Sequence, residues 1–373
     1  MHNKRILFII VVVVILLYLI YRYNKRHNVS KFQYYTPMGE IKTKYPIGTI
    51  LRSEIPLSLR MKLNRASVQA RAPPMDVQIP ESFDWRQVAP EYIGEPLDQE
   101  QCGSCWAFAT TGSLSDRVRI QTKGQHLVKK IDYQYGQSMG NETVQVLNAL
   151  SPYVLAACDT CNLSSTDPEV QKLLIQQDEC NQGCDGGIPQ WAYIFMHDNG
   201  MVSLGCDTTR TDYTCHSMTQ FGGQIKSGCH VFRFSPPIRA SLAEPEELAN
   251  ASDKMLEQNM RAIQTEIMTN GCISMGFAVY PSFMNYSSGV YKELSGNEQV
   301  EGGHAVAVVG WGVDDDGTPY WICRNSWGQH WGENGYFRIL RGKNFCNCES
   351  DMFGANVNLQ ALAQMPAMTS DSM

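Results

Sequence analysis

Two cysteines spaced three residues apart precede an apolar stretch, and this arrangement fits three kinds of chemistry. They lie in the segment Gln99-Glu-Gln-Cys-Gly-Ser-Cys-Trp-Ala-Phe108. A zinc site would need a second pair nearby, but Cys158-x-x-Cys161 lies about fifty residues further on, far outside zinc-ribbon spacing. A thioredoxin-like redox pair should follow a strand, whereas turn formers occupy residues 93–98. The third chemistry, a nucleophilic Cys105 at a helix N-terminus, is favoured because free N–H groups and the helix dipole stabilise a thiolate there.

A histidine and an amide that could complete this chemistry occur downstream. His304 begins an apolar strand and follows two glycines, which would let another chain approach closely. Asn325 ends the next strand, and the indole of Trp327 follows it. An amide beneath an indole can hold an imidazole in one tautomer and keep water away from it. The sequence therefore predicts a catalytic set of Cys105, His304 and Asn325.

The spacing of apolar residues, which predicts the elements that position these residues, changes along the chain from helical to strand-like. Helical spacing of apolar residues occurs in the first part at three places, residues 105–122, 144–157 and 188–199. A further helix at 253–269 is capped by Ser252 and ended by Gly271. Apolar runs typical of strands occupy residues 272–280, 304–312, 319–325 and 336–340. A helical half followed by a strand-rich half predicts an α+β fold of two lobes with a cleft between them.

With these motifs in this order, the chain resembles the papain family of cysteine proteases, and within it the cathepsin B group. The motifs shared with the family are Gln99 with Cys102-Gly-Ser-Cys105-Trp106, Gly183-Cys184-Asp-Gly186-Gly187, Gly303-His304-Ala305 and Asn325-Ser-Trp327-Gly328. The cathepsin B character comes from Ser115-Asp-Arg117, Gly310-Trp-Gly-Val313, Gly317-Thr-Pro-Tyr-Trp321 and Ile339-Leu-Arg-Gly342. The resemblance covers residues 79–357. It implies the papain-like two-lobe fold, with a helical N-terminal lobe, a β-barrel-like C-terminal lobe and the active-site cleft between them.

The resemblance also implies a role for each residue of the motifs. Cys105 would attack a peptide carbonyl as a thiolate paired with the imidazolium of His304, and an acyl-enzyme would form. Asn325 would orient the imidazole, and Trp327 would shield their hydrogen bond from solvent. The amide of Gln99 and the backbone N–H of Cys105 would form the oxyanion hole. This chemistry requires no metal and no cofactor.

Substrate contacts are expected at positions without side chains and at one acid. Gly186, Gly187 and Gly303 would let the backbone of a protein or peptide substrate lie alongside them as an extended strand. Asp351 lies five residues after Cys346, where the cathepsin B group carries an acid at the floor of the second subsite. The resemblance therefore implies that this subsite admits arginine as well as apolar side chains.

Thirteen cysteines, an odd number, indicate an oxidising compartment and at least one unpaired thiol. The resemblance implies a disulfide between Cys102 and Cys184. A second is expected between Cys161 and Cys180. Four more cysteines are expected to pair among themselves in an undetermined order: Cys158, Cys206, Cys215 and Cys229. Cys272 and Cys323 lie in apolar strands and are predicted to be buried free thiols.

The chain also departs from the cathepsin B pattern. Extra polar sequence at residues 134–143 and 164–177 is expected to form surface insertions. The region that would hold an occluding loop, residues 204–230, contains only the isolated His216 and His230 rather than adjacent histidines. The sequence therefore predicts an endopeptidase and gives no support for release of dipeptides.

The N-terminal residues indicate a membrane anchor. An uninterrupted apolar run over residues 6–21 lies between Arg5 and Arg22, and the residues after it lack a site for signal peptidase. Counting flanking basic residues would keep the following domain in the cytosol. The cysteines and the five glycosylation sequons argue for a lumenal or extracytoplasmic domain, which we favour; the sequon asparagines are Asn28, Asn141, Asn162, Asn250 and Asn285.

Four segments follow from these observations: a transmembrane signal anchor at 1–22, a stalk or pro-segment at 23–78, a papain-like peptidase domain at 79–357 and a tail at 358–373. The net charge of -6 and the pI near 5.8 argue against a nucleic-acid partner. The predicted function is therefore a membrane-tethered cysteine endopeptidase. The alternative is a catalytically inactive papain-fold protein with a binding or structural role.

Overall fold

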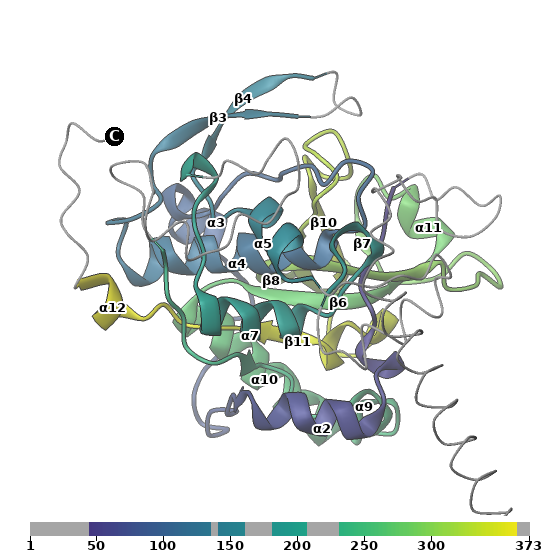
Figure 1. The fold of residues 1–373 in the computed structure, drawn as a ribbon. Helices are drawn as coiled ribbons and strands as arrows, with labels where there is room; N and C mark the ends of the chain where they lie inside the picture. Colours follow the sequence, from purple (N-terminus) through teal and green to yellow (C-terminus); the bar gives the residue numbers. More distant parts are fainter. Residues whose placement is uncertain (1–44, 136–140, 161–180, 207–230, 364–373) are drawn as a thin grey trace, which may run out of the picture.

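The computed structural model describes residues 45–135, 141–160, 181–206 and 231–363, and helices surround one large sheet in it (Figure 1). The α-helices are α2 (Leu57–Arg65), α3 (Trp85–Val88), α4 (Cys105–Gln121), α5 (Pro152–Cys158), α7 (Pro189–Asn199), α9 (Pro245–Ala249), α10 (Asp253–Asn270), α11 (Pro281–Met284) and α12 (Leu359–Ala363). Short 3-10 turns are η1 (Arg52–Glu54), η2 (Pro90–Tyr92), η4 (Gly183–Asp185), η5 (Leu204–Cys206) and η6 (Phe345–Ser350).

The strands of the described residues form two sheets. They are β1 (Val68–Gln69), β2 (Phe83–Asp84), β3 (Lys130–Gln134), β4 (Thr143–Leu147), β5 (Ile238–Arg239), β6 (Ile273–Val279), β7 (Val290–Tyr291), β8 (Gly302–Val313), β9 (Pro319–Arg324), β10 (Tyr336–Leu340) and β11 (Met352–Gly354). The large sheet has the order β1-β5-β11-β6-β8-β9-β10-β7, and β2 also pairs with β8. Strands β3 and β4 form a separate hairpin. Because β8 pairs antiparallel with β9, His304 near the start of β8 and Asn325 just after β9 lie at the same end of the pair.

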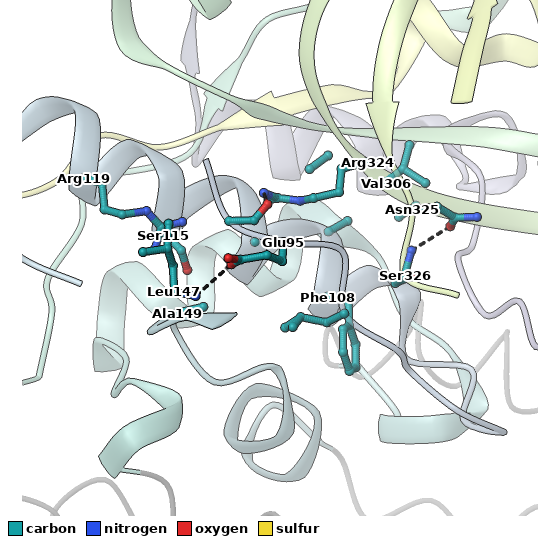
Figure 2. Close-up of a pocket in the computed structure, with 16 residues that line it drawn as sticks. Glu95, Phe108, Ser115, Arg119, Leu147, Ala149, Val306, Arg324, Asn325 and Ser326 are labelled. Carbon is teal, nitrogen blue, oxygen red and sulfur yellow. Dashed lines mark hydrogen bonds between the residues drawn. The ribbon is translucent and has the colours of Figure 1, made fainter. Parts of the chain in front are cut away.

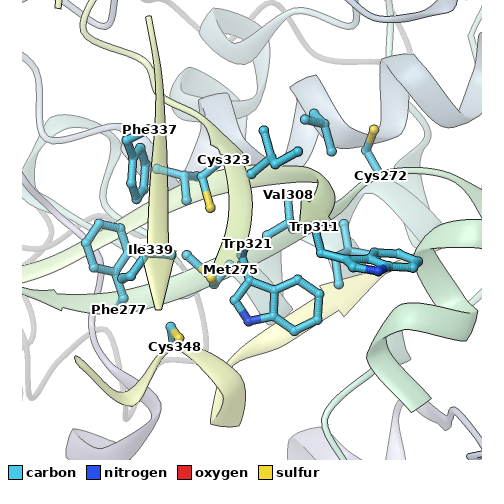
Figure 3. Close-up of a cluster of buried hydrophobic side chains, with 14 of the residues drawn as sticks. Cys272, Met275, Phe277, Val308, Trp311, Trp321, Cys323, Phe337, Ile339 and Cys348 are labelled. Carbon is cyan, nitrogen blue, oxygen red and sulfur yellow. The ribbon is translucent and has the colours of Figure 1, made fainter. Parts of the chain in front are cut away.

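Two hydrophobic cores correspond to the two predicted lobes. The strand-rich lobe is packed with aromatic and sulfur-containing side chains, among them Phe277, Trp311 and Trp321 (Figure 3). The helical lobe has its own core, built by α4, α5, α7 and the residues around Met201. The prediction of an α+β fold with a helical and a strand-rich part is confirmed. Cys272 and Cys323 are buried free thiols, as predicted.

Helix α4 connects the lobes through a buried ion cluster. The carboxylate of Asp116 pairs with Arg119 on the same helix at 2.7 Å and with Arg324 on β9 at 2.9 Å. It also accepts a hydrogen bond from the backbone N–H of Gly94 at 3.0 Å. These side chains are almost completely buried. The cluster therefore fixes the catalytic helix, the chain before Gln99 and the strand that ends at Asn325 relative to one another.

Most predicted elements are present with nearly the predicted bounds. Helices α4, α7 and α10 match their patterns, and the Ser252 hydroxyl caps α10 by accepting a hydrogen bond from the Met255 N–H. The helix predicted at 144–157 is wrong in its first half, which forms strand β4 of the hairpin. The less exposed, β-branched Val144 and Val146 alternate with the exposed Thr143 and Gln145, and this strand pairs with β3. The helix begins only after the N-cap Ser151, with Pro152 at its first position.

The described part of the predicted stalk or pro-segment, from residue 45 onward, is folded against the domain. It contains helix α2, which its irregular pattern did not predict, because a helix of nine residues depends mainly on tertiary contacts. Strand β1 adds in parallel to β5 at the edge of the sheet. Three of the sequon asparagines lie in described parts of the chain and are exposed: Asn141, Asn250 and Asn285.

The predicted membrane anchor lies outside the described residues. Within the residues that the structure describes, no helix is both long and apolar enough to cross a bilayer. The second predicted insertion, 164–177, and the predicted pair Cys161 and Cys180 also fall outside them. Cys158 and Cys206 are both disulfide-bonded, in agreement with the expectation that they do not remain free.

Replacing Asp116 by Ala should lower the free energy of unfolding by about 3–5 kcal/mol, because two buried guanidinium groups would lose their counter-charge. The measurement is thermal or denaturant unfolding of the purified chain. Asp198→Asn at an exposed position is the matched control and should change the free energy by less than about 0.5 kcal/mol. Equal stability of the two variants would contradict the role assigned to the cluster.

Candidate active site

The predicted nucleophile occupies the first turn of α4 and is fully buried. The chain before it is held by a disulfide between Cys102 and Cys184, so the pairing implied by the resemblance is present. The backbone N–H of Gly103 also donates to the carbonyl of Cys184 at 3.0 Å. Gly103 has no room for a side chain, because a Cβ there would lie 2.4 Å from that carbonyl oxygen. The disulfide and this hydrogen bond together fix the sulfur of Cys105 at the N-terminus of α4.

The histidine and the asparagine are hydrogen-bonded to each other in a buried site. The Nε2 of His304 lies 2.7 Å from the Oδ1 of Asn325. That oxygen also accepts from the backbone N–H of Ser326 at 2.8 Å, so it acts as an acceptor and the proton resides on Nε2. The other ring nitrogen, Nδ1, is buried and has no hydrogen-bond partner among the described residues. Nδ1 is therefore available to take a proton.

An indole covers this hydrogen bond, as the sequence predicts for Trp327. Its ring stacks on the imidazole of His304 with centroids 4.6 Å apart. The opposite face of the indole stacks on Tyr45, also at 4.6 Å and nearly parallel. The imidazole is packed on another side by the ring of Phe277. Water is thereby excluded from the bond between His304 and Asn325.

The predicted oxyanion-hole residue, Gln99, lies in the same cleft. Its Oε1 accepts a hydrogen bond from the Ser326 hydroxyl at 2.5 Å, which leaves the Nε2 as the end that donates. The Nε2 donates to the carbonyl of Cys102 at 2.8 Å and to the carbonyl of Pro46 at 3.1 Å. The Nε2 of Gln99, which the resemblance assigns to the oxyanion hole, thus already donates hydrogen bonds to peptide carbonyls.

Residues 46–51 run through the cleft as an extended chain. The Thr49 N–H donates to the carbonyl of Gly303, and the Ile50 N–H donates to the carbonyl of Gly187, both at 3.0 Å. The N–H of Gly187 donates to the carbonyl of Gly48 at 2.7 Å. A Cβ on Gly303 would lie 2.0 Å from the Thr49 carbonyl oxygen. The predicted substrate-binding glycines therefore admit a polypeptide backbone, and here the backbone belongs to this chain.

This segment also contacts the nucleophile. The hydroxyl of Thr49 lies 3.2 Å from the sulfur of Cys105. Sequence reasoning did not identify Thr49, since a threonine in a segment without a regular period carries no signal of its own. The signal that could have found it is the adjacent Gly48, where a Cβ would lie 1.9 Å from the carbonyl oxygen of Gly103. Only glycine allows the segment to approach the helix so closely.

Burial under this segment changes the electrostatics of the pair. Desolvation raises the pKa of the Cys105 thiol, and this outweighs the hydrogen bonds from Thr49 and from nearby backbone groups, which lower it. Desolvation also lowers the pKa of His304 to about 4, although the hydrogen bond to Asn325 opposes it. In the covered cleft both shifts favour the neutral thiol and neutral imidazole. The thiolate–imidazolium pair predicted from the sequence is therefore disfavoured while residues 46–51 are in place.

Asp351 is buried under the same segment. Its Oδ2 accepts a hydrogen bond from the backbone N–H of Arg52 at 3.3 Å. A Cβ on Gly276 of strand β6 would lie 2.4 Å from that oxygen, so the carboxylate fills the space that the glycine leaves. Desolvation raises the pKa of Asp351 to about 6, and the charges of Arg52 and Arg239 oppose this shift.

A small cavity of about 30 Å³ lies beside the candidate catalytic residue Asn325, between α4 and β8 (Figure 2). Asn325, Ser326 and Arg324 line one side of it, and Glu95 and Leu147 line the other. Its volume suits a water molecule rather than a substrate. The carboxylate of Glu95 accepts a hydrogen bond from the Leu147 N–H at 2.8 Å, which connects the β3–β4 hairpin to the chain before Gln99. Within the described parts of the chain, no group of acidic, histidine and cysteine residues could hold a metal ion.

Comparison with known proteins agrees with this geometry. The family model described as papain family cysteine protease matches residues 79–131 and 151–355, so that most of the β3–β4 hairpin lies outside the match. Cathepsin B-like cysteine proteinase 2 of Haemonchus contortus is 30% identical over 322 residues, 82% of each chain. Cathepsin B-like CP3 of Giardia intestinalis is 32% identical over 317 residues, 84% of each chain.

Solved structures show the same fold. The structure of proCathepsin B S9 from Trypanosoma congolense superposes with a TM-score of 0.59 and 24% identity, and covers 90% of this chain and 95% of that one. A digestive procathepsin L 3 of Tenebrio molitor superposes with a TM-score of 0.52 over 80% of this chain and 79% of that one, at 22% identity. On the family match and the relatives, this chain belongs to the papain family of cysteine proteases and is cathepsin B-like.

Proposed function

We propose that this chain is an endopeptidase whose catalytic set is Cys105, His304 and Asn325, with Gln99 in the oxyanion hole. The observation that carries the proposal is the buried hydrogen bond from the Nε2 of His304 to the Oδ1 of Asn325, which leaves Nδ1 free to accept a proton. The backbone of residues 46–51 in the same cleft supports a polypeptide as the substrate. The hydrolysed bond is a peptide bond of a protein.

The proposed reaction has two halves. His304 takes the thiol proton, and the sulfur of Cys105 attacks the carbonyl carbon of the substrate. The Nε2 of Gln99 and the backbone N–H of Cys105 donate hydrogen bonds to the developing oxyanion, each worth about 3 kcal/mol. His304 then gives its proton to the leaving amine as the C–N bond breaks, and a thioester remains. Water, deprotonated by His304, attacks the thioester and releases the carboxylic acid and the free thiol.

The pro-segment reading of residues 23–78 extends this proposal. The bonds of residues 46–51 to Gly187 and Gly303, and the contact of Thr49 with Cys105, support a segment that blocks substrate entry until it is removed. The domain boundaries remain as the sequence predicts them: an anchor at 1–22, the pro-segment at 23–78, the peptidase at 79–357 and a tail at 358–373. Before removal of the segment, an extracytoplasmic peptidase domain on a membrane anchor fits the Cys102–Cys184 disulfide and the exposed sequons; removal would release the domain from the anchor.

Alkylation tests the catalytic assignment and the pro-segment together. At pH 5 to 6 the intact chain should react slowly with iodoacetamide or a peptidyl epoxide at Cys105, because its pKa is raised and that of His304 is lowered. After residues 23–78 are removed, Cys105 should be labelled selectively, as measured by mass spectrometry of tryptic peptides. Burial raises the thiol pKa at the other free cysteines of the described residues, which serve as internal controls: Cys272, Cys323, Cys346 and Cys348.

Cys105→Ser should abolish both the labelling and the cleavage of an unfolded protein substrate. Equal labelling of all free thiols after processing, with no proteolysis, would contradict the catalytic proposal and favour the inactive papain-fold alternative. Fast labelling of Cys105 in the unprocessed chain would contradict only the proposal that residues 23–78 block the site, and not the catalytic assignment.

The β3–β4 hairpin supports Gln99 from behind in this proposal. The hydroxyl of Tyr133 donates to the carbonyl of Asp98 at 3.1 Å, and that of Tyr135 donates to the carbonyl of Pro96 at 2.6 Å. Both tyrosines are buried. The hairpin therefore holds the peptide carbonyls of Pro96 and Asp98, just before the proposed oxyanion-hole residue. Both tyrosines lie in a segment that the family model does not match.

The double variant Tyr133→Phe with Tyr135→Phe should lower kcat several-fold and change KM little, because the oxyanion donor is less well positioned while substrate contacts remain. Steady-state kinetics on the processed enzyme are the measurement. Tyr92→Phe is the control, since the Tyr92 ring lies next to Gly124 and the hydroxyl groups that bond to segment 96–99 are those of Tyr133 and Tyr135. A kcat equal to that of the wild type would contradict the proposed support of Gln99 by the hairpin.

Asp351 is proposed as the acid of the second subsite. Its buried carboxylate at the cleft, beside the segment that occupies the place of a substrate, supports this assignment. Substrates with arginine second from the scissile bond should be cut at rates comparable to their phenylalanine counterparts. Asp351→Ala should reduce the arginine rate by about 1.5–3 kcal/mol in kcat/KM and spare the phenylalanine rate. An equal loss for both fluorogenic substrates would show that Asp351 is structural.

A further inference from the structure

The guanidinium of Arg52 occupies a closely fitted site at one end of the cleft. Its Nε and one terminal nitrogen donate to the two oxygens of Glu244 at 3.0 and 2.9 Å, a fork-to-fork arrangement. Its other terminal nitrogen donates to the Oε1 of Gln190 at 3.0 Å. The cation lies 5.5 Å from the ring centre of Phe353, within the range of cation–π attraction. The Arg52 side chain is only 1% exposed.

Three of these partners belong to the peptidase domain. Gln190 is in helix α7, Glu244 precedes α9 and Phe353 is in β11, and Gln190 and Phe353 are each 1% exposed. The remaining hydrogen-bond partner of the guanidinium, Asn64, belongs to the proposed pro-segment. The domain therefore contributes a carboxylate, an amide oxygen and an aromatic ring to one site, a set that matches the planar guanidinium group.

The course of the segment shows which part of a substrate would reach this site. Tyr45 stacks on Trp327, beside the imidazole that protonates the leaving amine. The earlier end of the segment thus lies on the leaving-group side, and Arg52 lies on the acyl side. The segment therefore runs in the direction opposite to a substrate, whose acyl part is N-terminal. Thr49, which contacts the sulfur of Cys105, marks the position of the scissile bond, so Arg52 takes the place of the third residue on the acyl side. The intervening Leu51 side chain lies against Gly303.

Removal of the segment would change the charge balance of this site. Three arginines now contact Glu244: Arg52, Arg60 and Arg239. Two of them lie in the proposed pro-segment and would leave with it. Arg239 would remain, and its charge is opposed by the nearby carboxylates of Glu244, Glu247 and Asp351. The buried amide of Gln190 would also lose both partners, because its Nε2 donates to Ser67 of the same segment. The vacated site would be acidic, with an unpaired buried acceptor.

We propose that Glu244, Gln190 and Phe353 form a guanidinium-binding subsite, which takes an arginine side chain of a peptide substrate at the third residue before the scissile bond. Arg52 occupies this subsite in the intact chain. The inference rests on the proposed endopeptidase function for its role in cleavage, whereas binding of the guanidinium does not depend on catalysis. It differs from the assignment of Asp351, which meets the backbone N–H of Arg52 and not its guanidinium.

The test has a cleavage arm and a binding arm. In the first arm, the full-length chain is produced and its pro-segment is then removed at acidic pH. The processed enzyme cuts fluorogenic peptides that carry leucine at the second residue before the scissile bond and either arginine or citrulline at the third. Citrulline keeps the shape of arginine and removes the charge. In the second arm, a labelled peptide of residues 45–66, with arginine or citrulline at position 52, binds the processed chain, and fluorescence anisotropy reports the affinity.

Arginine should be preferred over citrulline by roughly tenfold to a hundredfold in both arms, the range expected for a charge-assisted, bidentate contact. Glu244→Gln should reduce this ratio to nearly one. Glu246→Gln is the matched control and should preserve the ratio, because Glu246 contacts Arg60 and has a side chain that is 60% exposed. The comparison of arginine with citrulline on the wild-type chain needs no variant, so it decides the question even if Glu244→Gln does not fold.

The two arms separate the subsite from the enzyme. A preference for arginine in binding without cleavage of any peptide would support the guanidinium site and reject the endopeptidase. Cleavage of both peptides at equal rates would overturn the proposed substrate preference. Equal binding of the arginine and citrulline peptides would overturn the site itself, and so would a ratio that survives Glu244→Gln.

Discussion

The hydrogen bond from the Nε2 of His304 to the Oδ1 of Asn325 is the interaction on which the site depends. It fixes the tautomer, so Nδ1 carries the lone pair that can accept a proton. The fold supplies this geometry by pairing β8 with β9 antiparallel, and Trp327 protects it from water. The ion cluster of Asp116 joins the strand before Asn325 to the helix that carries Cys105. The packing of the two lobes therefore also determines the geometry of the site.

Desolvation has opposite consequences for positioning and for charge. Exclusion of water strengthens the hydrogen bonds of His304 and Gln99, but burial beneath residues 46–51 disfavours the thiolate and the imidazolium. In the proposed mechanism, the covered site therefore has its hydrogen bonds in place but lacks the charged pair. The same segment hydrogen-bonds to the backbone of Gly187 and Gly303 and places the guanidinium of Arg52 on the carboxylate of Glu244. On our proposal, these contacts mark the path along which a substrate would bind.

The sequence predicted the parts of this site that depend on short motifs. Cys105, His304, Asn325, Gln99 and the Cys102–Cys184 disulfide each lie in a run whose neighbours restrict their structure, such as the glycines before His304. Long helices with regular periods were predicted for the same reason. Strand β4 was mistaken for helix because its pairing with β3 decides its structure. Thr49, Arg52 and Glu244 could not be predicted, since their contacts join segments far apart in the chain without a local pattern.

The hydrogen bond that orients His304 is already formed in the intact chain, and we propose that charge separation between Cys105 and His304 requires removal of the covering segment. A pH titration of histidine-labelled protein by NMR, on the intact and on the processed chain, measures this directly. We expect His304 to stay neutral in the intact chain down to about pH 4, with the proton on Nε2. In the processed chain it should be an imidazolium at mildly acidic pH. An imidazolium in the intact chain at pH 6 would contradict the account.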